Sequence, residues 1–142
     1  IRHLRKCDPT GKHCYSHKDC CNVVSVAHNY CYRHQVYETT RLVAKKLHLK
    51  ESMYSVSFQS RLLSDPWLEP FTDLEIKRLA ESGIKRLAIV CPAFVSDNLE
   101  TLEEIAIAGK EIFLENGGER CDLIPCMNDD DRWIDVLSDL IK

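Results

Sequence analysis

The sequence predicts an α/β fold in which a parallel sheet carries helices on both faces and a cysteine-rich loop precedes the sheet. Three observations support this prediction. Short apolar runs typical of strands occupy residues 53–58, 84–91 and 121–126. Stretches of helical periodicity separate these runs, as expected for parallel strands joined by crossover helices. Cysteines rather than periodic apolar residues dominate residues 1–36, which we expect to form a loop or insertion before a domain at 37–142.

The composition restricts the class of protein. With 142 residues and 44% hydrophobic content, the chain is long enough for one modest core. A net charge of −3 argues against nucleic acid as the main partner. The basic residues 2–6 suit either a peripheral contact with lipid head groups or a solvated tail. No apolar run approaches the ~18 residues of a membrane span and no signal peptide is visible, so we expect a cytoplasmic protein.

Five of the eight cysteines lie in residues 7–31, where they alternate with histidines and a turn-forming D-P-T-G segment. Disulfides are disfavoured, since the rest of the chain is typical of a cytosolic α/β protein. Structural zinc and an iron–sulfur cluster both remain open, although the spacing lacks the paired C-x2-C motifs of zinc fingers. An irregular loop with free cysteines is the simplest alternative.

The elements follow in order after this loop. A helix is predicted at 37–47, and the run at 53–58 predicts the next strand. A second helix runs from Thr72 or Asp73 to about Ser82, and Gly83 ends it.

The aliphatic and β-branched residues of 84–91 indicate a strand buried on both faces. Beyond it, an acidic helix continues to about residue 114. A short strand at 121–126 and a terminal helix close the chain, and that helix is expected to bury an apolar stripe comprising Trp133, Ile134, Leu137, Leu140 and Ile141.

The acidic helix begins directly after the strand at 84–91. Ser96, Asp97 or Asn98 can cap it by accepting from its free backbone amides. Glu100 and Glu104 are four residues apart and share one helix face. Acidic residues at a helix start commonly only complement the helix dipole. Ligands of open α/β sheets nevertheless bind at the carboxyl ends of strands, so this carboxylate pair also suits proton transfer or a hard cation.

Two strings resemble the signatures of one enzyme family. Residues 91–105 read C-P-A-F-V-S-D-N-L-E-T-L-E-E-I, and residues 58–70 carry F-Q-S-R followed by P-W-L-E-P. Both are similar to motifs of ferrochelatases, which insert ferrous iron into porphyrins, and the resemblance runs at least over residues 29–142. It implies two similar Rossmann-like halves with porphyrin bound between them. By this resemblance the chain is the C-terminal half, its sheet has about four strands once the first is counted, and the N-terminal domain is absent.

The resemblance also implies roles for individual residues. Glu100 matches the catalytic acid that faces a histidine, here outside the chain, across the porphyrin and the incoming metal. Asp97 matches an acid that orients the site, and Glu104 matches the next step of an outward proton relay. That relay is shortened here, since a further acid of some relatives is replaced by Ala108. Four residues are expected to bind the substrate: Gln59, Ser60, Arg61 and Trp67.

Arg61 and Trp67 each have a structural alternative. A guanidinium can hold a porphyrin propionate through two hydrogen bonds, or it can pair with a neighbouring acid such as Asp65 or Glu69. The Trp67 ring suits the flat macrocycle, or it anchors the 66–70 loop. One departure lies close by, because relatives usually have glycine where this chain has Leu63.

Some ferrochelatases carry a cysteine-rich insertion, and some hold a [2Fe–2S] cluster. By resemblance the cluster ligands here would be Cys14, Cys20, Cys21 and Cys31, although relatives often have cysteine where this chain has Val36. We therefore expect a ferrochelatase, a lyase that inserts Fe²⁺ into protoporphyrin IX to form protoheme. The alternatives are a non-catalytic α/β fragment that binds a metal or a partner domain, and a chelatase acting on coproporphyrin III.

Overall fold

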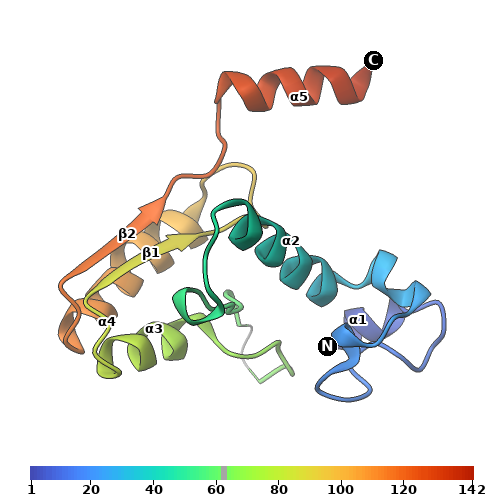
Figure 1. Cartoon of the computed structure of the whole chain (residues 1–142), viewed down its shortest axis with the longest axis horizontal. Coiled ribbons are helices and arrows are strands. Elements are labelled where there is room, and N and C mark those ends of the chain that lie inside the picture. The colour runs from blue at the N-terminus through green and yellow to red at the C-terminus, as the bar shows by residue number, and fades with distance from the viewer. Residues whose placement is uncertain (62–63) are drawn as a thin grey trace. The chain divides into compact units, whose positions relative to one another are not determined.

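The computed structural model describes residues 1–61 and 64–142, and the chain divides into two compact units at residues 1–71 and 72–142 (Figure 1). Helices and a parallel pair of strands make up these units, which confirms the predicted mixed α/β class. The predicted division at residues 36 and 37 stays a prediction. Within the described ranges, no helix is long and apolar enough to cross a membrane.

The first unit is built from short helices around a small core. Its elements are α1 (Arg2–Lys6), η1 (Cys20–Asn22), η2 (Val26–Tyr30), α2 (Tyr32–Lys46) and η3 (Glu51–Met53). The predicted helix at 37–47 is therefore present, but it begins earlier, at Tyr32. One cluster of buried residues in this unit comprises Leu4, Cys14, Ala27, Cys31, Phe58 and Leu68. Two of the loop cysteines thus serve as core residues, as small apolar side chains do.

The predicted strand at 53–58 is wrong for most of its length. Its first residue ends η3, and only Phe58 forms a bridge, in the parallel sense, with Phe71. The Phe58 amide donates to the carbonyl of Pro70 at 2.9 Å. An extended segment becomes a strand only when a neighbouring strand pairs with it along its length, and here a single bridge forms.

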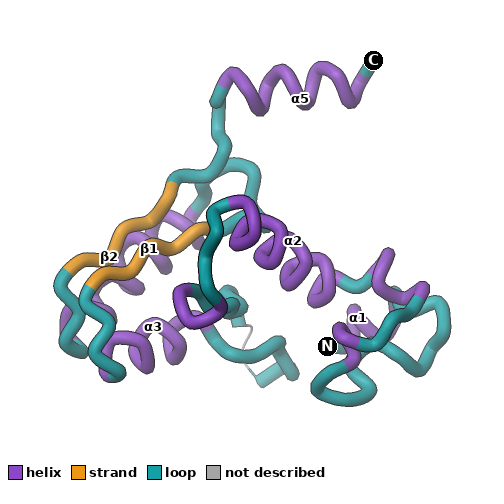
Figure 2. The backbone as a smooth tube through the Cα atoms, in the orientation of Figure 1, coloured by secondary structure: helices purple, strands orange, loops and turns teal. Residues whose placement is uncertain are grey.

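The second unit contains the sheet. Its elements are α3 (Thr72–Glu81), β1 (Arg86–Val90), η4 (Glu100–Gly109), α4 (Lys110–Glu115), β2 (Arg120–Ile124) and α5 (Asp131–Ile141). Strands β1 and β2 pair in parallel, with Arg86 opposite Arg120 and Val90 opposite Ile124, and appear as orange neighbours in Figure 2. The strands predicted at 84–91 and 121–126 are confirmed. The described part of the chain shows two strands in this sheet, not about four.

One face of the two-stranded sheet packs on helices of the second unit. Phe113 of α4 is fully buried and forms a core with Ile76, Ala80 and Cys121. Leu87 and Ile89 of β1 pack against this core. Exposure alternates along β1, and Val90 is 58% exposed. The prediction of burial on both faces is therefore wrong, because side chains alternate between faces and helices cover only one of them among the described residues.

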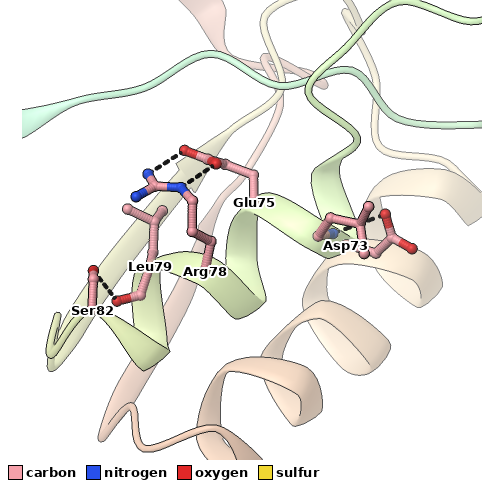
Figure 3. A network of polar contacts seen from close by, with 6 residues as sticks. Asp73, Glu75, Arg78, Leu79 and Ser82 are labelled. Carbon is pink, nitrogen blue, oxygen red and sulfur yellow. Dashed lines mark hydrogen bonds and ion pairs between the residues drawn. The ribbon is translucent and has the colours of Figure 1, made fainter.

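Helix α3 is fixed by local polar contacts (Figure 3). The Arg78 guanidinium donates two hydrogen bonds of 2.8 Å to the carboxylate of the buried Glu75. The Asp73 carboxylate accepts from the amide of Leu74 in the first turn. Gly83 follows with a φ of 92°, a left-handed conformation that glycine adopts without strain. The predicted helix and its glycine end are confirmed.

Helix α5 differs from its prediction. Asp130 caps it by accepting from the Arg132 amide at 3.0 Å, as the acidic run at its start predicts. In the part of the chain that the structure describes, none of the residues of α5 is fully buried. Trp133 and Leu137 are half-buried, while Leu140 is 76% exposed. The predicted buried stripe is therefore an open apolar face in this structure.

Candidate functional site

The acidic helix at the carboxyl end of β1 is a π-helix, η4, rather than the predicted α-helix. Its burial repeats every four residues, with Thr101, Ile105 and Gly109 buried. Glu100 and Glu104 precede two of these residues and are both half-buried, whereas Glu103 is exposed. In a π-helix the hydrogen bonds run from i to i+5, so residues four apart remain close to one line. The predicted sharing of one face by Glu100 and Glu104 therefore survives the change of helix type.

Asp97 ties the loop before η4 to the loop after β2. Its carboxylate accepts hydrogen bonds from Asn128 Nδ2 at 2.7 Å, Thr101 Oγ1 at 3.0 Å and the Cys126 amide at 3.3 Å. In return, Asn128 Oδ1 accepts from the Asp97 amide at 2.8 Å. These donors, led by the Asn128 amide, hold the pKa of Asp97 below its usual range. Asp97 is therefore a fixed anion that joins two loops at one edge of the sheet.

Thr101 and Asn98 form the start of η4. The Asn98 side-chain oxygen accepts from the Thr101 amide at 3.2 Å, while the Thr101 hydroxyl oxygen accepts from the Asn98 amide at 3.0 Å. This exchange satisfies two amides that a helix start otherwise leaves unpaired, and it selects Asn98 among the three predicted caps. Thr101 and Asn128 were not predicted as site residues. The one local signal for Asn128 is its left-handed φ of 45°, which asparagine tolerates better than most residues.

Two thiols lie close to Asp97. Burial raises the pKa of Cys91, and the negative charge of Asp97 raises it further. Burial and a hydrogen bond with Asp97 raise the pKa of Cys126 to about 11. Both side chains are therefore neutral thiols near neutral pH. Neither is fully buried, in contrast to Cys121, which belongs to the core around Phe113.

The predicted substrate-binding residues lie in the first unit. Trp67 Nε1 donates to the carbonyl of Gln59 at 2.9 Å, which fixes the tryptophan ring on the backbone beside it. The Arg61 guanidinium lies over the Phe71 ring, 4.5 Å from its centre. The described residues show no ion pair between Arg61 and Asp65 or Glu69, the structural alternative considered for this side chain. Arg61 instead presents its charge over an aromatic face.

Arg61, Trp67 and Phe71 line a cavity of about 360 Å³ in the first unit, together with acidic and polar neighbours. Ser60, which precedes Arg61 in the sequence, does not line this cavity and has a left-handed φ of 62°. Leu63, where relatives usually have glycine, falls outside the described residues. The structure thus brings Arg61 and Trp67 to one cavity, and Asp97 and Glu100 to one helix start, each group within its own unit.

The cysteine-rich loop is organised by a buried carboxylate. Asp8 is 7% exposed and accepts hydrogen bonds from the amides of Thr10, His13 and Cys14 at 2.6 to 2.8 Å. These donors hold the pKa of Asp8 well below its usual range, against the opposing effect of burial. The loop therefore has a fixed polar centre, and it otherwise matches the simplest prediction, since it consists mainly of turns and its cysteines are free.

The four predicted cluster ligands lie in this loop as free cysteines. Burial and a hydrogen bond with Cys31 raise the pKa of Cys14 to about 12. Burial raises the pKa of Cys21 to about 12, and the neighbouring thiols of Cys20 and Cys31 contribute. Across the described ranges, no group of three or more histidine, cysteine or acidic side chains is arranged to hold a metal ion. The donor types suit an iron–sulfur cluster, but their arrangement here does not fit one.

Comparisons with known proteins agree on one family. A family model described as ferrochelatase matches residues 14–142. A ferrochelatase of Opitutus terrae is 52% identical over 142 residues, which are 100% of this chain and 41% of that protein. Two ferrochelatases of Pseudomonas fluorescens are 49% and 47% identical over 99% of this chain and 42% of their own length. The chain therefore spans about two fifths of the curated relatives that it matches.

Proposed function

Because it matches the family model over residues 14–142, the chain belongs to the ferrochelatase family, and we propose that it forms part of an enzyme that inserts Fe²⁺ into a porphyrin. The observation that carries this proposal is the half-buried acidic face of η4, which follows directly from an anchored Asp97. A carboxylate pair held this way at the carboxyl end of a parallel strand lies where ligands of α/β sheets bind.

The reaction requires bases and weak metal ligands. A free-base porphyrin must lose two pyrrole protons before its nitrogens can hold a divalent metal. We assign proton acceptance and transient contact with Fe²⁺ to Glu100, since a carboxylate can perform both tasks. Glu104, on the same half-buried face, receives protons next in the outward direction. Asp97 does not exchange protons in this proposal, because its carboxylate is already committed to three donors.

The first unit supplies the substrate contacts. Arg61 and Trp67 line one cavity, and the Trp67 ring is held by Gln59, so a flat ligand with a carboxylate finds an aromatic face and a cation together. Gln59 and Ser60 complete the proposed binding set. We propose protoporphyrin IX as the substrate, with coproporphyrin III as the alternative. The two differ in their number of carboxylates, and relative rates on each distinguish them.

The place of the chain in the enzyme is also a proposal. We propose that it is the C-terminal half, that its sheet gains strands to reach about four, and that a preceding domain supplies a histidine opposite Glu100. The chain covers 41% and 42% of the length of two of its relatives, as expected for one part of a two-domain protein. These percentages do not by themselves say which part it is. The complete reading frame of the gene shows which part of the enzyme this chain represents. A domain encoded before Ile1 supports the proposal, and one encoded only after Lys142 makes this chain the N-terminal part and removes the basis for that histidine.

Two further proposals concern surroundings and cofactors. We propose a cytoplasmic enzyme with a peripheral lipid contact through the basic residues of α1. A [2Fe–2S] cluster stays a prediction, and iron reconstitution of the chain tests it. A stable visible spectrum with two iron atoms and two inorganic sulfides per chain supports the cluster. Colourless protein after reconstitution contradicts it.

The functional assignment is tested with the complete enzyme. Iron insertion into protoporphyrin IX is followed by the change in porphyrin absorbance for wild type, Glu100→Gln and the matched control Glu103→Gln. We expect Glu100→Gln to lower kcat about 100-fold or more, the scale of lost general-base catalysis, while the exposed Glu103 tolerates the same change. Equal rates for the two variants would refute the role of Glu100. No insertion by the wild-type enzyme would refute the proposed function itself.

A further inference from the structure

Three histidines of the first unit come together outside every site described so far. His13, His28 and His34 are half-buried, and the rings of His28 and His34 stack with their centres 3.7 Å apart. The ring of His13 meets that of His28 edge to face, with 5.2 Å between centres. None of these side chains takes part in the proposed reaction.

Two of the ring nitrogens converge on one backbone oxygen. His13 Nε2 lies 2.9 Å and His28 Nε2 lies 3.2 Å from the carbonyl oxygen of Cys20, and the two nitrogens are 3.3 Å apart. The three atoms therefore form a nearly equilateral triangle. Each carries a lone pair or one proton, and the carbonyl can only accept. Hydrogen bonds can form between at most two of the three pairs of atoms, whereas a cation placed between the atoms can bind the lone pairs of all three.

The dimensions of this triangle match transition-metal coordination. For metal–nitrogen bonds of about 2.05 Å, a separation of 3.3 Å corresponds to an N–metal–N angle of about 107°, close to tetrahedral. The three atoms lie about 1.8 Å from a common centre, so a metal at bonding distance from each would sit about 1 Å out of their plane.

We propose that His13 and His28 bind a divalent transition-metal ion of the zinc type, completed by the Cys20 carbonyl oxygen and water. Imidazole nitrogen suits such ions, and a site with two protein side chains and solvent is open and exchangeable rather than structural. Metal binding requires each ring to carry its proton on Nδ1, so that the lone pair of Nε2 is free for the ion. The site is distinct from the four thiols, since no sulfur atom enters the triangle.

His34 acts as a positioning residue in this proposal. Its Nδ1 lies 3.2 Å from the carbonyl oxygen of Cys21, and its stacking fixes the plane of the His28 ring. Because Cys20 and Cys21 are adjacent, the three imidazoles together hold one turn of the loop. Metal binding therefore has little to reorganise, which favours affinity.

Zinc titration of the full chain tests the site, with Zn²⁺ alone as the probe and X-ray absorption at the zinc edge as the readout. We expect nitrogen or oxygen ligands at about 2.0–2.1 Å for the first equivalent, whereas thiolates give about 2.3 Å. His13→Ala and His28→Ala should each weaken binding about tenfold or more, as loss of a coordinating group does, and the exposed His17→Ala serves as matched control. Asn or Gln in place of His28 tests the same contact if the alanine variant fails to fold.

The outcomes separate this site from the others. A first shell of sulfur alone, or unchanged affinity in both histidine variants, overturns the proposal. The absorption measurement on wild type needs no variant, so misfolding of a mutant cannot obscure the result. Porphyrin metallation is not part of the readout, so failure of the proposed enzymatic function leaves this test intact.

Discussion

Replacement of Thr101 by valine tests how the start of η4 is built. The threonine is fully buried, and its hydroxyl accepts from the Asn98 amide while its proton is offered to Asp97 Oδ1 at 3.0 Å or to the Asn98 carbonyl at 3.1 Å. Valine has a similar volume but no hydroxyl, so the partly buried Asn98 amide loses its hydrogen-bond partner. We expect a loss of about 1–3 kcal/mol in the free energy of unfolding, the usual cost of an unpaired buried polar group.

Thermal unfolding followed by circular dichroism measures this loss. For a unit of this size each kcal/mol corresponds to about 4–8 °C, so Tm should fall by about 4–24 °C. Thr101→Ser keeps the hydroxyl and should retain most of the stability. The pKa of Asp97 should also rise toward its usual value in the valine variant, because one of the donors that lower it is gone. A valine variant as stable as wild type, with the serine variant less stable, would refute the reasoning.

Three further predictions concern other parts of the chain. Gly118→Ala should strongly destabilise the second unit in thermal unfolding, because the added Cβ would overlap the buried Phe113 ring; an unchanged Tm would contradict this. A hydrogen bond from the Arg132 side chain lowers the pKa of Asp130 to about 2, so the ionised cap stabilises α5 above pH about 4 and this stabilisation is lost as the pH falls toward 2. Circular dichroism should show a loss of helix between pH 4 and 2 in the wild type, and the Asp130→Asn variant should not show this loss. Alkylation near neutral pH should modify the exposed Cys7 before the buried Cys14, whose pKa is raised to about 12; the reverse order in mass spectrometry would contradict the described loop.

Local sequence signals were sufficient where the physics is local. Helix α3 could be predicted because its apolar period and its terminal Gly83 lie within one short stretch. The strands β1 and β2 could be predicted from composition alone. The shared face of Glu100 and Glu104 followed from their spacing and holds for a π-helix as it does for an α-helix.

Features that depend on distant partners could not be predicted. Asn128 lies 31 residues from Asp97 in sequence, and only the pairing of β1 with β2 brings them together. The segment 53–58 has the composition of a strand, but a ladder requires a neighbour that composition does not name. The apolar stripe of α5 was predicted correctly as a stripe, while its burial depends on what packs against it. The wider turn of η4 escapes a search for 3.6-residue periodicity.

Iron insertion tests the central claim most directly, namely that the acidic face of η4, with Glu100 and Glu104, belongs to the active site of a ferrochelatase. The assay follows porphyrin absorbance with Fe²⁺ and protoporphyrin IX for the chain alone, for the chain with the remaining part of the enzyme, and for that complex carrying Glu100→Gln. The account predicts insertion only in the wild-type complex and its loss when Glu100 is replaced. Insertion that is unaffected by Glu100→Gln, or a folded complex with no insertion at all, would contradict it.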